Sequence, residues 1–307
     1  PTRYPARRAV TMGLARRGRI PTYVWMMLPG LVLFLAFFIG PLFVAFRLSF
    51  YDWPGIGTRM DFVGLRNFTD LLTDYQVWRA LLHNLYFFIL VFFLQNTVGL
   101  GLALLLDARL PGHAIHRTVL FIPAVLSLTV TSYMWELMLS PQLGIVNPAL
   151  KAVGLGGLQR VWLGDPSISL TVVILVQAWQ WMGIPMVVYL AGLRAIPREF
   201  TEAAMLDGAN SRQVLFRVTF PLLAGPFTAL TIICFVMMFR VFDLIYILGG
   251  PQGEPDGSTT TIGLVMLNEA FGGRMSYAMA IGVFSYALLG LIAGLLFLAL
   301  RRRELSF

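Results

Sequence analysis

Six long stretches of this chain are apolar and nearly free of charge, and they limit its possible folds more than any other feature. Of the 307 residues, 58% are hydrophobic and 12% are charged, whereas an average soluble domain is about 25% charged. Each stretch is long enough to cross a hydrocarbon core of about 30 Å as a helix. The stretches are residues 24–46, 81–106, 118–139, 168–193, 222–248 and 275–300. The sequence therefore predicts an all-α membrane protein with six transmembrane helices.

The segments outside these stretches predict a simple organisation. A single six-span domain, residues 24–300, lies between a basic tail at 1–23 and a short tail at 301–307. Arginines before an apolar run are also typical of a signal peptide. However, the 24–46 stretch is too long for a signal-peptide core and no small-x-small cleavage site follows it, so we expect it to remain as an anchor.

The distribution of the 23 Lys and Arg residues predicts the orientation in the membrane. If the N-terminus is cytoplasmic, the inner tails and loops hold fifteen of them and the outer loops seven, with Arg240 inside a span. Because short cytoplasmic loops carry the excess of basic residues, both termini and the 194–221 segment are expected in the cytoplasm. No basic stripe with interleaved aromatic residues accompanies the net charge of +8, so no nucleic-acid partner is predicted.

The sequence predicts neither an enzyme nor a metal site. Cys234 is the only cysteine and lies in an apolar stretch, which excludes an intrachain disulfide and a thiolate cluster. Lys151, the only lysine, does not follow a glycine-rich loop, so the chain has no P-loop and any ATP hydrolysis must come from a partner. His83, His113 and His116 lack neighbouring ligands, and no nucleophile–base constellation is present.

One polar stretch, residues 198–226, interrupts the apolar pattern with its own local signals. Pro197 suits the first turn of a helix, and Gly208 supplies a left-handed residue that ends it. Asn210 and Gln213 have the spacing of a capping box, and Pro221 limits a second helix. We expect two short helices joined by a tight corner.

The amino-acid sequence of this stretch resembles the EAA loop of binding-protein-dependent ABC importer permeases. Three blocks carry the resemblance: Glu-Ala-Ala at 202–204, Asp-Gly-Ala-Asn at 207–210, and Phe-Pro-Leu at 220–222, with Gln213 between the last two. The resemblance implies the MetI-like permease fold and a loop, about 194–221, that docks into an ATPase subunit. The residues then expected at the ATPase cleft are Glu202, Ala203, Ala204, Asp207 and Gly208. Composition alone fits an ordinary juxtamembrane hairpin equally well.

Further blocks at 62–68, 144–147, 191–197 and 242–251 are similar to the sugar and glycerol-phosphate branch of that family. The resemblance implies a bacterial inner-membrane permease with two ATPase subunits that bind ATP and Mg, so the chain itself needs no cofactor. It also implies a second permease subunit, expected to be a different chain, and an extracytoplasmic binding protein that docks on 47–80, 140–167 and 249–274. The solute would be a carbohydrate or related polyol, and both a neutral sugar and a glycerol-phosphate-like anion fit.

Polar residues inside the predicted spans are candidates for the translocation path, because such residues face a cavity or another helix rather than lipid. Gln177, Gln180 and Trp181 share one helical face of the fourth span. Amides that bind hydroxyls beside an aromatic ring suit a carbohydrate, but the same side chains also hold helices together.

The fifth span offers three further path candidates: Arg240, Asp243 and Tyr246. Arg240 is suited either to an anionic substrate or to an i,i+3 ion pair with Asp243, and we expect the ion pair. Glu136, near the outer end of the third span, is expected to lie at the interface or against a helix.

A different class of function is an ion-coupled secondary transporter or channel subunit. Such a protein needs acids near the midplane of several spans or broken helices in repeated halves. Only Glu136 and Asp243 are acidic within the predicted spans, both near an end, and no convincing repeat is present. A membrane anchor or receptor without transport is a third alternative, which the 198–226 stretch disfavours.

Overall fold

The computed structural model describes residues 22–108 and 112–301, and the chain divides into two units between Ala45 and Phe46. The predictions for residues 1–21, Arg109 and residues 302–307 lie outside the described residues.

The described part of the N-terminal unit is one long apolar helix. It consists of α1 (Thr22–Phe34), a π-helical turn (Leu35–Ile39) and most of α2 (Gly40–Leu48). The Gly40 N–H closes the π turn by donating to the Leu35 carbonyl. Pro41 follows directly, and its missing N–H favours this local change of hydrogen bonding. Residues Trp25–Leu48 are long and apolar enough to cross a membrane, which agrees with the predicted first span.

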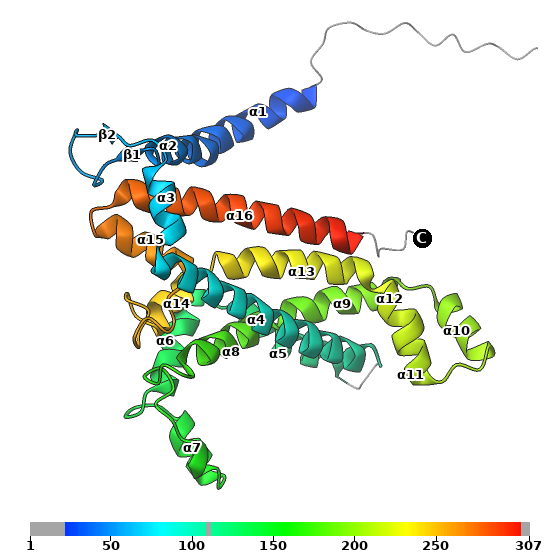
Figure 1. Cartoon of the computed structure of the whole chain (residues 1–307). Helices are drawn as coiled ribbons and strands as arrows, with labels where there is room; N and C mark the ends of the chain where they lie inside the picture. Colours follow the sequence, from blue (N-terminus) through cyan, green and yellow to red (C-terminus); the bar gives the residue numbers. More distant parts are fainter. Residues whose placement is uncertain (1–21, 109–111, 302–307) are drawn as a thin grey trace, which may run out of the picture. The chain divides into compact units, whose positions relative to one another are not determined.

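The second unit is built around α4 (Tyr75–Asp107), a helix of 33 residues that contacts α8, α9, α13 and α15 (Figure 1). The last helix, α16 (Met275–Arg301), packs against α13 and α15. The remaining helices of this unit are α3 (Arg66–Thr73), α5 (His113–Val125), α6 (Leu128–Leu139), α7 (Val146–Ala152), α8 (Ser169–Trp181), α9 (Gly183–Ala195), α10 (Arg198–Leu206), α11 (Ser211–Val214), α12 (Phe220–Leu222), α13 (Ala224–Phe239), α14 (Asp243–Leu248) and α15 (Ile262–Phe271). The predicted all-α class is confirmed.

Three of the six candidate spans are bent pairs of helices rather than single rods. The angles are 94° between α5 and α6, 45° between α8 and α9, and 61° at the break before α13. Proline explains part of this pattern, because Pro185 cannot donate to the carbonyl four residues earlier, across the break after Trp181. Three straight helices are long enough to cross a membrane, and the number becomes six when each bent pair counts as one span.

Glycines allow the helices to approach closely at two crossings. A Cβ on Gly183 would lie 2.9 Å from the Cα of Phe121, and a Cβ on Gly99 would lie 2.7 Å from the Cβ of Pro185. Glycines at such crossings let α9 pack directly on α5 and α4, as is usual between membrane helices.

Three hydrophobic clusters hold the second unit together. The largest lies where α4, α8, α13 and α14 meet, around Phe87 and Ile174. A second joins α3, α4, α15 and α16 around Leu71 and Ile281. The third joins α4, α9 and α13 around Met186. The long α4 contributes to all three clusters, which makes it the common packing surface.

Two sequence predictions about the outer half of the fifth span and the loop after it are wrong. The span does not continue from 222 to 248, because α13 ends at Phe239 and α14 begins separately at Asp243. Arg240 has left the helical conformation (ψ 3°), and Phe242 is also outside it (φ −139°). The segment 249–274, predicted as a loop, contains α15. The segment 140–167 contains a short helix of its own, α7.

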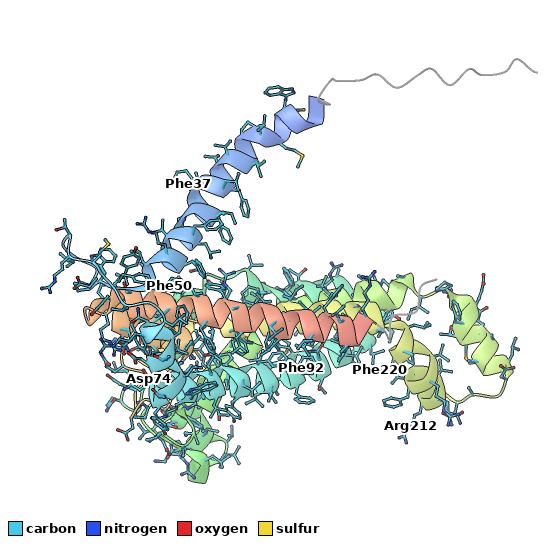
Figure 2. All side chains as sticks on the ribbon, turned by 45° about the horizontal axis from the view of Figure 1, so that its top comes forward. Phe37, Phe50, Asp74, Phe92, Arg212 and Phe220 are labelled. Atoms are coloured by element: carbon cyan, nitrogen blue, oxygen red, sulfur yellow. The ribbon has the colours of Figure 1, made fainter. Side chains whose placement is uncertain are left out.

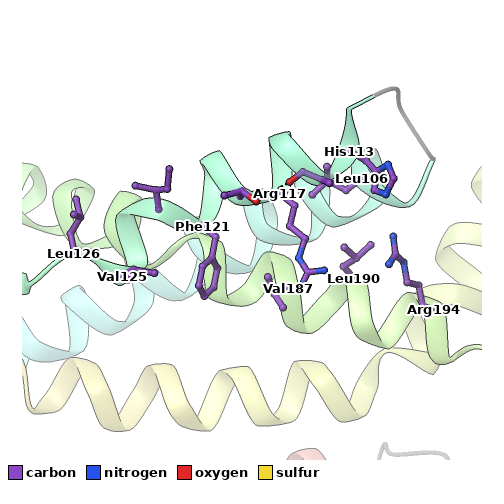
Figure 3. Close-up of a pocket in the computed structure, with 12 residues that line it drawn as sticks. Leu106, His113, Arg117, Phe121, Val125, Leu126, Val187, Leu190 and Arg194 are labelled. Atoms are coloured by element: carbon purple, nitrogen blue, oxygen red, sulfur yellow. Dashed lines mark hydrogen bonds between the residues drawn. The ribbon is translucent and has the colours of Figure 1, made fainter.

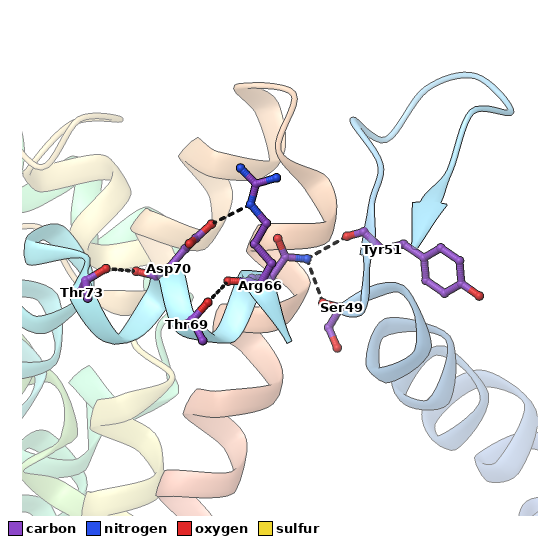
Figure 4. Close-up of polar contacts among 7 residues, drawn as sticks. Ser49, Tyr51, Arg66, Thr69, Asp70 and Thr73 are labelled. Atoms are coloured by element: carbon purple, nitrogen blue, oxygen red, sulfur yellow. Dashed lines mark hydrogen bonds and ion pairs between the residues drawn. The ribbon is translucent and has the colours of Figure 1, made fainter. Parts of the chain in front are cut away.

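Polar connections gather at the two opposite ends of the second unit. Asp74, at the start of α4, and Arg212, on α11, mark these ends in Figure 2. At the Asp74 end, a two-residue strand β1 (Tyr51–Asp52) pairs antiparallel with β2 (Asp61–Phe62). The Asn67 side-chain amide donates to the carbonyls of Ser49 and Tyr51, at 2.8 and 2.7 Å, and ties this hairpin to α3 (Figure 4).

Candidate functional site: a capped hairpin and an intramembrane path

The segment after α9 forms the two-helix corner that the sequence predicts. Pro197 occupies the N-cap position of α10, one residue before the first turn in which the sequence places it. Gly208 has φ +84°, the left-handed conformation expected of it. The N–H groups of Gly208 and Ala209 donate to the carbonyls of Met205 and Ala204, at 3.1 and 3.0 Å. These bonds satisfy the last carbonyls of α10 and end it sharply.

A complete capping box then starts the second arm. The Gln213 N–H donates to Asn210 Oδ1 at 2.9 Å, and the Asn210 N–H donates to Gln213 Oε1 at 2.8 Å. The arm continues through α11, a π-helical turn (Leu215–Thr219) and α12. The arm ends at Leu222, one residue after Pro221, which agrees with the end of the helix that the sequence predicts.

The corner exposes both polar and apolar side chains. Glu202, Ala203, Asp207 and Gly208 are exposed, and Ala204 is partly buried. Nearby, Leu206 is 89% exposed, Phe216 67% and Met205 56%. Exposed apolar side chains beside charged ones are a feature of surfaces that contact another protein or a membrane.

A polar cavity of about 870 Å³ lies at the root of the hairpin. Its lining includes Glu202 and Arg198 from α10, Asp107 from the end of α4, and Arg194 from the end of α9. Arg194 Nε lies 3.7 Å from Asp107 Oδ1, an exposed ion pair of the kind that contributes about 1 kcal/mol or less. The pair joins the end of α4 to the end of α9 at the root of the hairpin.

A second cavity, of about 620 Å³, lies between α5 and α9 (Figure 3). His113, Arg117 and Arg194 lie toward one end of it, and Val125 and Leu126 lie toward the other. Its cationic end therefore adjoins the root of the hairpin, and its apolar end adjoins the bend between α5 and α6.

The polar candidates of the fourth span are brought together on α8. Gln177 and Gln180 are 3% and 1% exposed, and Trp181 is partly buried. Gln180 Nε2 donates to the Leu126 carbonyl at 3.2 Å, a carbonyl at the 94° bend between α5 and α6. Gln180 therefore holds two spans together, as one of the two interpretations of its sequence expected. Gln177 Oε1, Gln180 Oε1 and Trp181 Nε1 are buried without a partner among the described residues.

The candidates of the fifth span do not form the arrangement that the sequence predicts. No ion pair joins Arg240 to Asp243, although both are described. The i,i+3 geometry requires one continuous helix, and the break between α13 and α14 removes it. Arg240 and Asp243 are exposed, and the Tyr246 ring lies 5.6 Å from that of Phe242.

A set of contacts that sequence reasoning missed fixes the N-terminal part of α4. The Asn84 amide donates to the Met238 carbonyl at 3.0 Å, and Asn84 Oδ1 accepts from the Ile262 N–H at 2.9 Å. His83 Nδ1 lies 2.8 Å from the Thr260 carbonyl, which requires a proton on that nitrogen. We call these three-element contacts the Asn84 clasp. Their only sequence signal is a polar Asn in an apolar helix.

Two carboxyl groups at this end of the second unit have shifted pKa values. The hydroxyl and the N–H of Ser167 donate to Asp165 Oδ1, at 2.6 and 2.9 Å, and hold the Asp165 pKa below its usual range. Burial raises the pKa of Glu269, and Arg274, whose Nη1 lies 3.0 Å from Glu269 Oε2, opposes that rise.

Within residues 22–108 and 112–301, no cluster of three or more His, Cys, Asp or Glu side chains is arranged to hold a metal ion. His113, His116 and Glu136 are exposed, and Cys234 is buried.

Apolar spans, polar side chains buried between them and a capped, exposed hairpin at one end together define a multi-span membrane permease. The chain belongs to the family of binding-protein-dependent transport system inner membrane components, whose model matches residues 14–305.

Relatives and solved structures agree with this family. The chain is 32% identical to the multiple sugar-binding transport system permease protein MsmF of Streptococcus mutans, over 86% of this chain and 89% of that protein. It is 31% identical to the trehalose/maltose transport system permease protein MalF of Thermococcus litoralis, over 86% and 88%. A crystal structure of a bacterial ABC transporter involved in the import of alginate shares the fold, with a TM-score of 0.78 and 23% identity, covering 92% of this chain and 95% of that one.

The chain is thus a permease subunit of an ABC importer, with the MetI-like fold that the sequence predicted. A transporter permease is not an enzyme. Membership of this family also argues against the two alternative functions, an ion-coupled transporter and a membrane anchor without transport.

Proposed function

We propose that this chain forms half of the translocation path for a carbohydrate or related polyol. In the proposed complex it works with a second, different permease subunit, two ATPase subunits that bind ATP and Mg, and an extracytoplasmic binding protein. The names of MsmF and MalF support a sugar as the solute, as does the lactose transport system permease protein LacF of Rhizobium radiobacter, which is 32% identical over 88% of this chain and 90% of that protein.

The observation that carries the proposal is the exposed hairpin of α10 and α11. Its apolar side chains Met205, Leu206 and Phe216 lie beside the charged Glu202 and Asp207, a combination suited to a protein cleft with a polar rim. We assign the ATPase contact to Glu202, Ala203, Ala204, Asp207 and Gly208. Glu202 pairs with a basic residue or with a helix N-terminus of the ATPase.

The orientation belongs to the same proposal. Fifteen basic residues on the hairpin side against seven on the other side support cytoplasmic termini and a cytoplasmic hairpin. The binding protein then docks at the opposite end of the second unit, on 47–80, 140–167 and 249–274. These segments carry β1, β2, α3, α7 and α15.

The proposed solute path runs along α8, past Gln177, Gln180 and Trp181, toward Arg240, Asp243 and Tyr246. The buried, unpaired amide oxygens of Gln177 and Gln180 support it, because a sugar hydroxyl donates to such an acceptor. The exposure of Arg240 and Asp243 without a mutual ion pair also supports it, because both charges remain free to meet a solute or a partner chain.

The test is reconstitution. The chain is purified in nanodiscs with its two ATPase subunits, its second permease and its binding protein, and ATPase activity is measured with maltose, trehalose, lactose and glycerol. We expect at least one of these solutes, delivered by the binding protein, to stimulate the ATPase. Stimulation by none of the four would overturn the proposed solute class, and a complex that transports without ATP would overturn the whole proposal.

A further inference from the structure

A small polar cavity lies inside the second unit, where the bend of the fourth span meets α4 and α13. Its volume is about 80 Å³. It is lined by Gln95 and Asn96 from α4, by Trp181 and Pro185 on either side of the bend, and by Cys234 and Met238 from α13. Gln95 lies twelve residues before the end of α4, about 18 Å along the helix axis, so the cavity is at the depth of the hydrocarbon core.

The cavity contains hydrogen-bonding groups without protein partners. Gln95 is 6% exposed, and its Nε2 has no partner among the described residues. The indole N–H of Trp181 is also buried and unpaired. The amide nitrogen of Gln95 is a hydrogen-bond donor, and an indole nitrogen is only a donor. A buried donor at this depth is costly unless something accepts its hydrogen bond.

The other polar side chain of the cavity does not provide that acceptor. Asn96 Nδ2 donates to the Phe92 carbonyl at 2.8 Å, and Asn96 Oδ1 accepts from the Tyr189 hydroxyl. Asn96 is therefore engaged within its own helix and with α9, whereas Gln95 and Trp181 remain open toward the cavity.

We propose that Gln95 and Trp181 form a subsite that binds one hydroxyl-type oxygen of the transported carbohydrate. This inference rests on the proposed function and adds Gln95, on α4, to the path residues of α8. Liquid water occupies about 30 Å³ per molecule, so a volume of about 80 Å³ takes one hydroxymethyl arm or about two waters. The subsite therefore binds one substituent of the sugar and is too small for its whole ring.

The oxygen that fills the subsite comes either from the sugar or from water, and the indole of Trp181 distinguishes the two. In the complete complex, tryptophan is replaced by 5-fluorotryptophan and the Trp181 fluorine resonance is assigned with Trp181→Phe. Maltose, trehalose, lactose and glycerol are then titrated in the millimolar range. We expect at least one of them to shift this resonance, and Gln95→Met to weaken its apparent affinity about tenfold, the loss of one hydrogen bond to a buried group.

Thr97→Val is the matched control, because Thr97 lies on the same helix but is exposed; it should leave the titration unchanged. A resonance that no probe shifts, but that responds to exchange of H₂O for D₂O in a Gln95-dependent way, would overturn the subsite in favour of bound water. An unchanged affinity in Gln95→Met would remove Gln95 from it. If a probe stimulates the ATPase but does not shift the Trp181 fluorine resonance, the subsite is contradicted and the proposed function is not.

Discussion

The two ends of the second unit are stabilised in opposite ways. At the hairpin end, the capping box and the bonds around Gly208 join residues three to five positions apart. In the Asn84 clasp, the hydrogen bonds join residues more than 150 positions apart and cross three elements. Local bonds allow the hairpin to keep its shape while its outer surface stays free for a partner. Long-range bonds instead depend on the packing of the whole unit.

The largest expected effect is a loss of folding stability when the Asn84 clasp is broken. Asn84→Leu leaves the buried Met238 carbonyl and Ile262 N–H without partners, and it should destabilise the protein by about 2–6 kcal/mol, at 1–3 per unpaired group. Unfolding in mixed detergent micelles with increasing dodecyl sulfate measures this. Asn210→Ala, which removes the exposed capping side chain of the hairpin, should cost only about 1 kcal/mol. Equal losses of stability in the two variants would contradict the view that the two ends are stabilised differently.

The next effect concerns the partner surface rather than stability. Glu202→Lys should weaken ATPase binding by about 2 kcal/mol or more, because it reverses a charge at the centre of the proposed contact. Folding should be unaffected, since Glu202 is exposed. Co-purification of the ATPase and solute-stimulated hydrolysis are the measurements. Glu199→Lys, an equal charge reversal on the same helix, should bind nearly normally, and full transport by the Glu202 variant would contradict the assignment.

A smaller effect is expected at the corner itself. Gly208 has φ +84° and nothing within 4 Å of the position of an added Cβ, so a substitution there is limited by the backbone alone. Gly208→Val should destabilise the corner by about 1–2 kcal/mol, whereas Gly208→Asn should be better tolerated because Asn adopts this conformation more readily. Hydrogen exchange of residues 198–214 measures the difference. Identical exchange in the two variants would show that the corner is not set by the left-handed residue.

The smallest effect is a pH dependence at the opposite end. The Asp165 pKa is depressed by Ser167, so the stability that this carboxylate contributes is present above its ordinary pKa and is lost as pH falls through its folded value. Ser167→Ala removes the hydroxyl donor but keeps the backbone N–H, and should raise the Asp165 pKa part of the way toward its ordinary value. Carbon NMR of the labelled carboxyl group follows the titration. An unchanged midpoint would exclude the hydroxyl as a cause.

The same contrast explains what the sequence could predict. The corner at Gly208 and the capping box at Asn210 follow from residues a few positions apart, so local chemistry sufficed to predict them. The six apolar stretches likewise predicted the all-α class. The Asn84 clasp was missed because its partners are distant in sequence, and a lone Asn in an apolar helix does not indicate which carbonyl it meets.

The errors at the fifth span have a related cause. Hydropathy does not distinguish one continuous helix from two helices separated by a short break, so the separation of α13 from α14 was not visible. The expected pairing of Arg240 with Asp243 depended on that continuity and was lost with it. On α8, in contrast, Gln177, Gln180 and Trp181 do share one helix, because the bend falls directly after them.

Site-specific cross-linking from the hairpin tests the central claim most directly. In a Cys234→Ala background, which removes the only cysteine, Met205→Cys places a single thiol on the exposed surface of α10. We expect a cross-link to the ATPase subunit in the assembled complex, and labelling by a membrane-impermeant maleimide only in inside-out vesicles. Labelling in right-side-out vesicles, or a transporting complex with no cross-link to the ATPase, would contradict it.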